Sequence, residues 1–387
     1  MRLLDPQDWS FPVPIAYGPG RLRDLPAICR MAGTERPLLV TDRGSRELPF
    51  VRQSLDALTG AGLSGAVFAE ISPNPRDTEI EAGRKAFAQG GHDGVIGIGG
   101  GSGMDGAKAI ALTAKSGVGL WEFEFERPAP TIGPEAFPPL ITIPTTAGTG
   151  AETESTAMIT DMAQGMKFCV WHAALKPACA LLDPALTLGL PPSLTAWTGI
   201  DALTHAIEAY CVPGFHPLCD GAALEGLRLI HACLPKTMAA PGDVEARAGM
   251  LVGSCLAGIA FVKGLGIVHA VSHMVGAEYE THHGLTNAVL LPAALRFNEP
   301  AMGDRVRPMT EAMGLAHHDA DALYGAVCTH LDALEIPGSL GAIGVPEDCA
   351  PRIATKAMRD SAAATNAKIA TAEEMERFVY DAILEAR

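Results

Sequence analysis

The sequence predicts two consecutive domains, an α/β domain over residues 1–187 and an all-helical domain over residues 188–387. Short apolar runs that stop at Asp, Gly or Thr alternate with segments of helical period in the first half. After Pro191 only helical periodicity remains. Alternation of strand and helix is typical of a mainly parallel sheet covered by helices. The boundary is expected in LDPALTLGLPPS (182–193), where three prolines interrupt the pattern.

The elements follow this division along the chain. Five apolar runs are expected as strands: 36–42, 65–72, 93–101, 139–146 and 178–183. Between two of them, TEIEAGRKAFAQGG (78–91) has helical period. The second half shows helical period over 193–210, 220–238, 246–261 and 373–386. No comparable strand is expected after about residue 185.

The composition of the chain excludes several classes of protein. The chain has 387 residues, of which 48% are hydrophobic and 19% charged, which is enough for two packed cores. The net charge of −15 without a basic block argues against nucleic acid or an anionic membrane as a partner. No secretory signal is expected, and the apolar runs are broken short of a membrane span. Nine cysteines without CxxC pairs indicate a reducing cytoplasm rather than a disulfide framework.

A glycine-rich turn predicts a nucleotide site. VIGIGGGSGMDGAKAIAL (95–112) combines a strand, a turn and a helix. The turn holds three consecutive glycines, Gly99, Gly100 and Gly101. They allow a ligand to approach the backbone, Ser102 is expected to cap the helix, and the free N–H groups favour a phosphate. A GxGxxG string from Gly101 to Gly106 begins after the strand and runs into the helix, and it therefore carries little weight as a dinucleotide fingerprint. A tight turn with no ligand is the alternative.

Two further features belong to this expected site. IPTTAGTGAETE (143–154) follows a strand and presents the hydroxyls of Thr145, Thr146 and Thr149. They are candidates for lining a sugar or pyrophosphate, although a hydroxyl-rich turn explains them equally. Asp42 ends the first strand, where a carboxylate accepts hydrogen bonds from a ribose diol and repels a 2′-phosphate. This favours NAD over NADP, with a turn-forming Asp at the strand end as the alternative.

A carboxylate and several imidazoles predict a metal site. GIDALTHAIEAY places Asp201 and His205 four residues apart, on one face of a helix. A hydrogen-bonded pair is the alternative. Downstream, four histidines lie within fifteen positions, His269, His273, His282 and His283. This donor set suits Fe²⁺ or Zn²⁺ and suits Mg²⁺ or Ca²⁺ poorly. On spacing alone, His282 and His283 compete as the ligand.

At these residues the chain resembles the iron-containing (group III) alcohol dehydrogenases. The resemblance is carried by GGGSGMDGAKAIA, IPTTAGTGAE, LLDPALTLGLPPSLTAWTGIDALTHAIEAY and GLGIVHAVSHMVGAEYETHHGLTNAVLLPAALRFN. It implies a Rossmann-like sheet in the first domain and an architecture shared with dehydroquinate synthase. It also implies Fe²⁺, with Zn²⁺ as the alternative, in a catalytic helical domain. The implied ligands are Asp201, His205, His269 and His283, since the family's last ligand is the histidine directly before glycine.

The same resemblance implies where NAD(P) binds. The residues expected to contact the nucleotide are Asp42 at the adenosine ribose, Gly99, Gly100, Gly101, Ser102, Thr145, Thr146, Thr149 and Leu182. His273 is implied to lie near the nicotinamide and the substrate. It is the candidate for relaying the alcohol proton, with packing beside the metal as the alternative.

Two segments resemble the 4-hydroxybutyrate dehydrogenase branch of this family. They are AFVKGLGIVHAVSH and KFCVWHAALKPACALLDP. That branch has a lysine at the position of Lys263, which is expected either to hold a substrate carboxylate or to lie along the surface with its charge in water. The segment between His269 and His283 is shorter than in that branch. Residues 121–130 form an acidic, aromatic loop without an assigned role.

The expected function is metal-dependent hydride transfer between NAD(H) and a primary alcohol or aldehyde. Candidate substrates are 4-hydroxybutyrate and succinate semialdehyde, and family habit implies a homodimer. The rivals are a dehydroquinate synthase-like lyase, a maleylacetate reductase working without metal, and a non-catalytic nucleotide-binding protein. Retention of all four ligand positions argues against the reductase.

Overall fold

The computed structural model describes residues 13–385, which group into two compact units. One unit holds residues 13–146 and 150–190, and the other holds 147–149 and 191–385. The main division therefore follows Leu190, inside the proline-rich segment singled out in the sequence. Residues 1–12 and 386–387, which the sequence analysis assigned to the two domains, lie outside the described residues.

The first unit is built on a six-stranded sheet in the order β1-β8-β5-β4-β2-β3, with parallel pairing throughout. Its strands are β1 (Ile15–Tyr17), β2 (Pro37–Asp42), β3 (Ala66–Ile71), β4 (Gly94–Gly99), β5 (Leu140–Pro144) and β8 (Cys179–Leu182). The five expected strands are all present, and the predicted mainly parallel sheet is confirmed. Strand β1 was not predicted, because three residues are too few to show a pattern.

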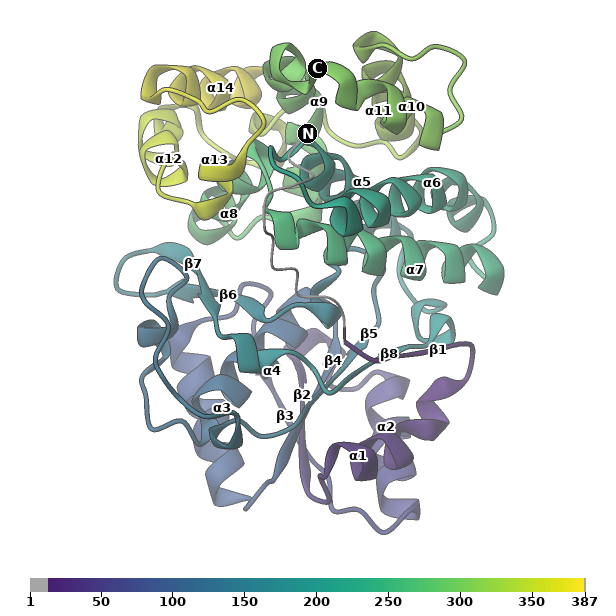
Figure 1. Cartoon of the computed structure of the whole chain (residues 1–387), viewed down its shortest axis with the longest axis vertical. Coiled ribbons are helices and arrows are strands. Elements are labelled where there is room, and N and C mark those ends of the chain that lie inside the picture. Colours follow the sequence, from purple (N-terminus) through teal and green to yellow (C-terminus); the bar gives the residue numbers. More distant parts are fainter. Residues whose placement is uncertain (1–12, 386–387) are drawn as a thin grey trace. The chain divides into compact units, whose positions relative to one another are not determined.

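Helices cover both faces of this sheet (Figure 1). They are α1 (Leu25–Ala32), α2 (Pro49–Gly60), α3 (Asp77–Gln89) and α4 (Gly101–Ala114). Successive strand residues point to opposite faces. Leu38 and Val95 therefore join one apolar cluster with α3 and α4, whereas Leu39 and Ile96 join a second cluster with α1 and α2. Burial on both faces explains why the strands are continuous apolar runs.

A two-stranded antiparallel sheet, β6 (Thr156–Asp161) and β7 (Met166–Trp171), accompanies the main sheet and was not predicted. The acidic, aromatic loop 121–130 lies against it. The backbone N–H of Phe125 donates to the carbonyl of Cys169 at 2.9 Å, and the rings of Trp121 and Phe168 lie 5.9 Å apart edge to face. The loop thus extends the edge of β7.

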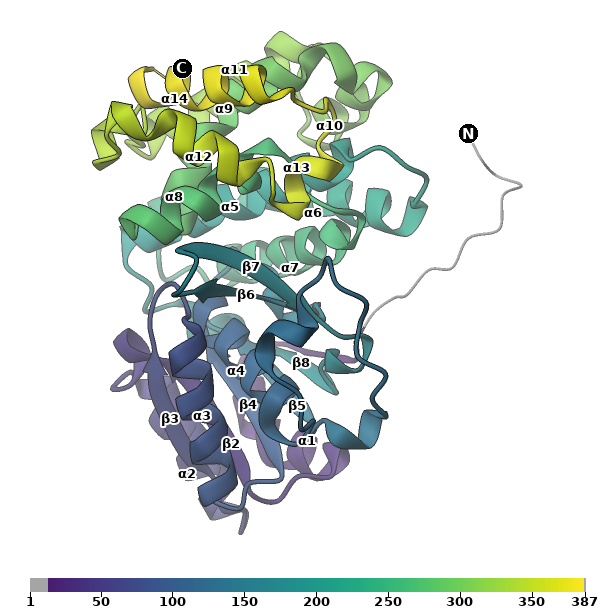
Figure 2. The ribbon, with the colours of Figure 1, turned by 90° about the vertical axis from the view of Figure 1, so that its left-hand side faces the viewer.

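The second unit is helical, and from residue 191 to 385 no strand is found (Figure 2). Its helices are α5 (Pro192–Cys211), α6 (Pro217–Ala239), α7 (Val244–Ala260), α8 (Ile267–Tyr279), α9 (His283–Met302), α10 (Val306–Ala312), α11 (Ala320–Ala333), α12 (Ala350–Ala357), α13 (Ser361–Thr365) and α14 (Ala372–Leu384). Helix α5 is buried along most of its length, because α6, α7 and α9 pack around it. Polar side chains on α5 are therefore held inside the unit.

One helical segment corrects the expectation that every apolar run is too short for a membrane span. Val244–Lys263 is long enough and has a mean hydropathy of 1.4. Most of that window, 61%, is buried inside the structure, as in the core helix of a soluble protein. Length and apolar composition therefore reflect its packing against α5 and α6.

Candidate active site

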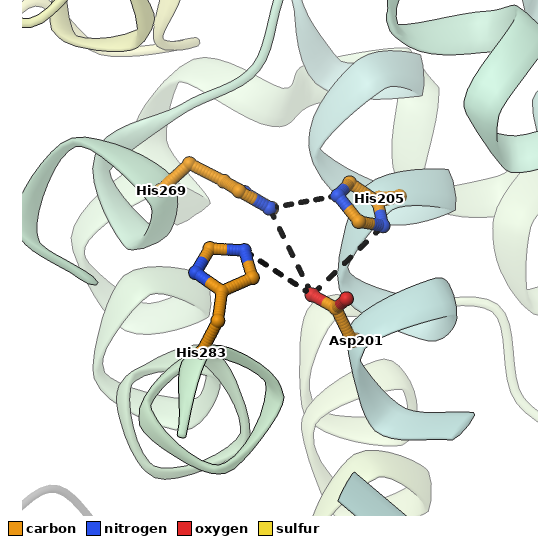
Figure 3. Close-up of side chains that lie close together, drawn as sticks. All are labelled: Asp201, His205, His269 and His283. Carbon is orange, nitrogen blue, oxygen red and sulfur yellow. Dashed lines mark hydrogen bonds and ion pairs between the residues drawn. The ribbon is translucent and has the colours of Figure 1, made fainter. Parts of the chain in front are cut away.

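Three helices of the second unit bring four side chains together (Figure 3). The four are Asp201, His205, His269 and His283, whose donor atoms all lie within 4.8 Å of one another. Helix α5 contributes Asp201 and His205 from successive turns, α8 contributes His269, and α9 begins with His283. The set that the resemblance implied thus forms one cluster, buried except for the partly exposed His283.

Hydrogen bonds on the outer side of each imidazole fix which nitrogen faces the cluster. Nδ1 of His205 lies 3.2 Å from the carbonyl oxygen of Gly148, and Nδ1 of His269 lies 2.6 Å from Oε2 of Glu208. Both oxygens only accept, so each Nδ1 carries the proton and each Nε2 presents a lone pair inward. Nδ1 of His283 lies 3.0 Å from the hydroxyl of Ser272.

The inward atoms fit a divalent cation. Nε2 of His205 and Nε2 of His269 are 2.9 Å apart, and Oδ1 of Asp201 lies 3.9 Å from Nε2 of His269 and 3.7 Å from Nε2 of His283. Lone pairs that converge in this way are stabilised by positive charge between them, which a divalent cation would supply. Burial lowers the pKa of His205 to about 4, so its imidazole is neutral and free to act as a ligand. One carboxylate with three imidazoles suits Fe²⁺ or Zn²⁺.

A buried carboxylate, Glu208, connects this cluster to the start of α8. Its two oxygens accept from the backbone N–H groups of Gly266 at 3.1 Å and Val268 at 2.8 Å, in addition to His269. Burial acts to lower the pKa of His269, but the hydrogen bond and charge of Glu208 outweigh it and raise the pKa. Glu208 therefore caps α8 from another helix. It also makes the lone pair on Nε2 of His269 a stronger ligand for a metal ion.

Gly284 explains why a glycine follows the last cluster histidine. A Cβ at Gly284 would lie 2.5 Å from the carbonyl oxygen of Trp197 and 3.2 Å from Cβ of Asp201. Only glycine allows α9 to start this close to α5, which brings His283 to Asp201. His282 lies outside the cluster, and its ring packs 4.9 Å from that of Trp197.

His273 lies next to the cluster without joining it. Its ring stacks on that of His283, with centroids 5.5 Å apart and planes 11° apart. Its Nδ1 lies 2.8 Å from Oδ2 of Asp360, a buried residue that also caps α13. Since a carboxylate only accepts, Nδ1 of His273 carries a proton and Nε2 is left free to exchange one.

Lys263 has partners that the sequence did not indicate. Its Nζ pairs with Oδ1 of Asp220 and lies 3.3 Å from the carbonyl oxygen of Tyr210. The side chain is only 5% exposed, so the interpretation of a surface lysine with its charge in water is wrong. Arg305 lies 3.5 Å from the same carboxylate, so two cations share one anion here.

The predicted nucleotide residues of the first unit lie at the carboxyl ends of adjacent strands. Asp42 ends β2, Gly99 ends β4, Thr145 follows β5 and Leu182 ends β8. These four strands are neighbours in the sheet. The chain runs from β2 outward to β3 and then returns to the other side of β2 with β4. Ligands of open parallel sheets bind at the carboxyl ends beside such a reversal.

The glycine turn is shaped for close approach to the backbone. Gly99 has φ +143°, and a Cβ there would lie 3.2 Å from Oδ2 of Asp42 and 3.3 Å from Oγ1 of Thr41. The N–H of Thr145 donates to the carbonyl of Gly99 at 2.9 Å. Oγ1 of Thr146 is buried and, among the described residues, has no hydrogen-bond partner. A turn without side chains beside an unpaired hydroxyl fits the pyrophosphate of NAD.

Three details differ from the expectations for this turn. Ser102 does not cap α4, because the N-cap is Gly100 and the Ser102 hydroxyl instead donates to the carbonyl of Pro73. Asp42 caps the short helix Arg43–Ser45, accepting from the N–H of Ser45 at 3.0 Å and from its hydroxyl at 2.7 Å. Thr149 belongs to the helical unit. The string Gly101 to Gly106 lies inside α4, as expected.

Sequence reasoning missed three buried polar residues at the metal cluster. Glu208 lies three residues after His205 and Asn287 lies four residues after His283, so helical spacing alone could have placed both on the ligand face. Asp360 lies 87 residues from His273 and carries no such signal.

Comparison with known proteins places this fold and site in a class. Residues 12–184 match the model of the iron-containing alcohol dehydrogenases, and residues 195–383 match that of the C-terminal part of the Fe-containing alcohol dehydrogenase family. The chain therefore belongs to the iron-containing alcohol dehydrogenase family. It is an oxidoreductase that acts on the CH–OH group of alcohols, as predicted.

Individual relatives cover nearly the whole chain. The chain is 36% identical to a 4-hydroxybutyrate dehydrogenase of Cupriavidus necator, over 93% of this chain and 95% of the relative. It is 34% identical to an NAD-dependent methanol dehydrogenase of Bacillus methanolicus, over 97% and 100%. A crystal structure of a 1,3-propanediol oxidoreductase superposes with a TM-score of 0.92 at 32% identity, over 97% and 100% of the two chains. The predicted fold class and the predicted cofactors, NAD and iron, are confirmed at the level of the family.

Proposed function

We propose that the protein transfers hydride between NAD(H) and a primary alcohol or aldehyde at the cluster of Asp201, His205, His269 and His283. The observation that carries this proposal is the convergence of four donor atoms within 4.8 Å in a buried site. We further propose 4-hydroxybutyrate and succinate semialdehyde as the substrate pair. A relative named for 4-hydroxybutyrate and the two cations around Asp220 support that choice.

The mechanism assigns a task to each group. Asp201, His205, His269 and His283 would hold a divalent ion, which would supply a Lewis acid for the oxygen of the alcohol or aldehyde. Burial of Asp201, His205 and His269 keeps water from the reacting atoms. The residues of the glycine turn and of the neighbouring strand ends would hold NAD, whose nicotinamide would supply the hydride chemistry. The residues therefore orient the reactants and need no side-chain nucleophile.

His273 is proposed to relay the alcohol proton. Asp360 holds Nδ1 of its ring at 2.8 Å, which turns Nε2 away from that carboxylate. The parallel stacking on His283 keeps the ring beside the ligand cluster. An imidazole with one nitrogen bound to a carboxylate can accept a proton at its other nitrogen and donate it again.

For the nucleotide, we propose NAD in preference to NADP and assign that preference to Asp42. Replacement of Asp42 with glycine is expected to lower the ratio of kcat/KM for NAD to that for NADP by about 10- to 100-fold, because hydrogen bonds to a charged group are worth about 1.5–3 kcal/mol. Steady-state kinetics with both cofactors measure this ratio. Ser45→Ala removes the hydroxyl that donates to Asp42 but keeps the Asp42 carboxylate and its bond to the backbone N–H of residue 45, and it should leave the ratio unchanged. An unchanged ratio in Asp42→Gly would contradict the assignment.

NADH oxidation by protein loaded anaerobically with Fe²⁺, with succinate semialdehyde and butanal compared side by side, tests the function. Preference for the semialdehyde is expected, because Lys263 and Arg305 leave net positive charge beside Asp220. Phe261, two residues before Lys263, packs 5.2 Å from the ring of His205. If neither aldehyde is reduced, the proposed function is wrong. If both aldehydes are reduced at equal rates, the proposed substrate is wrong.

The role of Lys263 is tested by its own variant. Lys263→Ala is expected to raise KM for succinate semialdehyde by about tenfold and KM for butanal far less, since a charged hydrogen bond is lost only with the first. Asp220→Asn is the matched control, because it breaks the same ion pair but keeps the lysine. A rise of KM for both aldehydes alike would leave Lys263 with a purely structural role.

We also propose that the protein is a cytoplasmic homodimer. All nine cysteines are free, which suits a reducing compartment. Strand β1 is an edge strand with Ile15 and Tyr17 exposed by 41% and 45%, which offers an apolar edge for pairing. Light scattering of the purified protein measures the subunit number.

A further inference from the structure

Asn287 lies inside the metal cluster without being one of its four ligands. It is on α9, one turn after His283, and is fully buried. Its Nδ2 donates to Oδ1 of Asp201 at 2.6 Å and lies 3.1 Å from Nε2 of both His269 and His283. One side chain thus touches three of the four ligand groups at the atoms that face a cation.

The contact with Asp201 determines how the amide is oriented. Turning the amide around would place its oxygen 2.6 Å from Oδ1 of Asp201, and two acceptors repel at that distance. In the observed orientation Oδ1 of Asn287 is buried without a hydrogen-bond partner among the described residues. A buried unpaired oxygen is unfavourable, so the bond to Asp201 must outweigh it.

The oxygen that Asn287 contacts is also the one closest to the imidazoles. Oδ1 of Asp201 is the atom that lies 3.7–3.9 Å from nitrogens of all three histidines. An N–H donor on this oxygen uses one of its lone pairs and leaves the other for a cation. The neutral amide does this without adding a second negative charge to the ligand set.

We propose that Asn287 is a positioning residue of the metal centre. Its amide holds Asp201 so that the carboxylate binds through Oδ1 alone, and its side chain closes the side of the cluster between Asp201, His269 and His283. Asn287 thereby limits the protein ligands to four and keeps water from that side. The inference rests on the proposed metal site and extends it to coordination number.

Binding of Co²⁺ to the full-length protein, measured by chelator competition and by the visible absorption of the bound ion, tests this without turnover. Asn287→Leu fills similar space but lacks the donor, and Asn287→Ala lacks both. We expect both variants to bind Co²⁺ about 10- to 100-fold more weakly than the unmodified protein. Only Asn287→Ala should also lose absorption intensity, because an added water raises the coordination number and weakens the visible bands.

Asn298→Leu is the matched control, since Asn298 is a buried asparagine of the same helix that bonds to Asn366 instead of a ligand. It should keep the affinity of the unmodified protein, and an equal loss there would overturn the proposal. Unchanged affinity in either Asn287 variant would overturn it too, and an unchanged spectrum in Asn287→Ala would refute the closing of that side. If His283→Ala leaves Co²⁺ binding intact, the metal site itself fails, which is a separate result.

Discussion

Replacing His283 with alanine is expected to remove the tightly held metal and to lower kcat/KM by about 10³-fold. The side chain supplies one of four converging donors, and its Nε2 lies 3.7 Å from Oδ1 of Asp201. A metal acting as Lewis acid is worth several kcal/mol of transition-state stabilisation, and each 1.36 kcal/mol is about tenfold in rate. Metal content after dialysis and aldehyde reduction at saturating Fe²⁺ measure both effects.

The adjacent histidine provides an unusually close control. His282 lies outside the cluster and packs on Trp197. His282→Ala should therefore retain one metal per chain, although it loses the ring contact with Trp197. If His282→Ala lost the metal and His283→Ala kept it, the assignment of the fourth ligand would be reversed.

The second large effect is expected at Glu208. Glu208→Ala should lower the free energy of unfolding of the metal-free protein by about 3 kcal/mol, because it leaves three buried donors, the N–H groups of Gly266 and Val268 and Nδ1 of His269, without their acceptor. The same change should weaken metal binding by about 10- to 100-fold, since His269 is no longer oriented. Urea unfolding and chelator competition measure the two quantities separately.

The variant Glu208→Gln keeps the shape of the side chain but removes its negative charge, so it separates these two contributions to stability. It keeps one acceptor oxygen but turns an NH₂ group toward groups that donate, so its stability should lie between those of the unmodified protein and Glu208→Ala. Metal affinity equal to that of the unmodified protein in both variants would show that Glu208 serves only as the cap of α8.

Continuous apolar runs made most of the fold predictable. Strands β2, β4, β5 and β8 are buried on both faces and therefore stand out in the sequence, whereas β3 is an edge strand with Ala66 and Glu70 exposed. The hairpin of β6 and β7 was missed although its turn, residues 162–165, ends on Gly165 at φ 60°, because this turn is longer than the two-residue turns that mark a hairpin most clearly. Asp161 instead supports the turn, accepting from the N–H groups of Ala163 and Gln164.

From residue spacing alone, the candidate site was predictable only within single helices, and the family resemblance was needed to add His269 and His283. Asp201 and His205 are one helical turn apart, which a sequence shows directly. Gly284 is required because the backbone of Trp197, 87 residues earlier in the chain, lies against it. Asp360, which bonds to His273, lies 87 residues later in the chain than that histidine. Partners so far apart in the chain are set by the packing of helices. The misplaced cap at Ser102 is a smaller error, since α4 begins two residues earlier than expected and Gly100 is its N-cap.

Because the ligands lie on three different helices, α5, α8 and α9, metal binding also affects how long the protein persists in a cell. A cation bound to His205 and His269 joins positions 64 residues apart and binds only the folded chain. At a free metal concentration 100 times its dissociation constant, such binding adds about 2.7 kcal/mol to stability. Because proteases degrade unfolded chains, metal shortage would reduce the abundance of this enzyme as well as its activity. The supply of the metal would then control the rate of this reaction in the cell in two ways. It would determine the fraction of chains that hold a metal ion and the rate at which the chains are degraded.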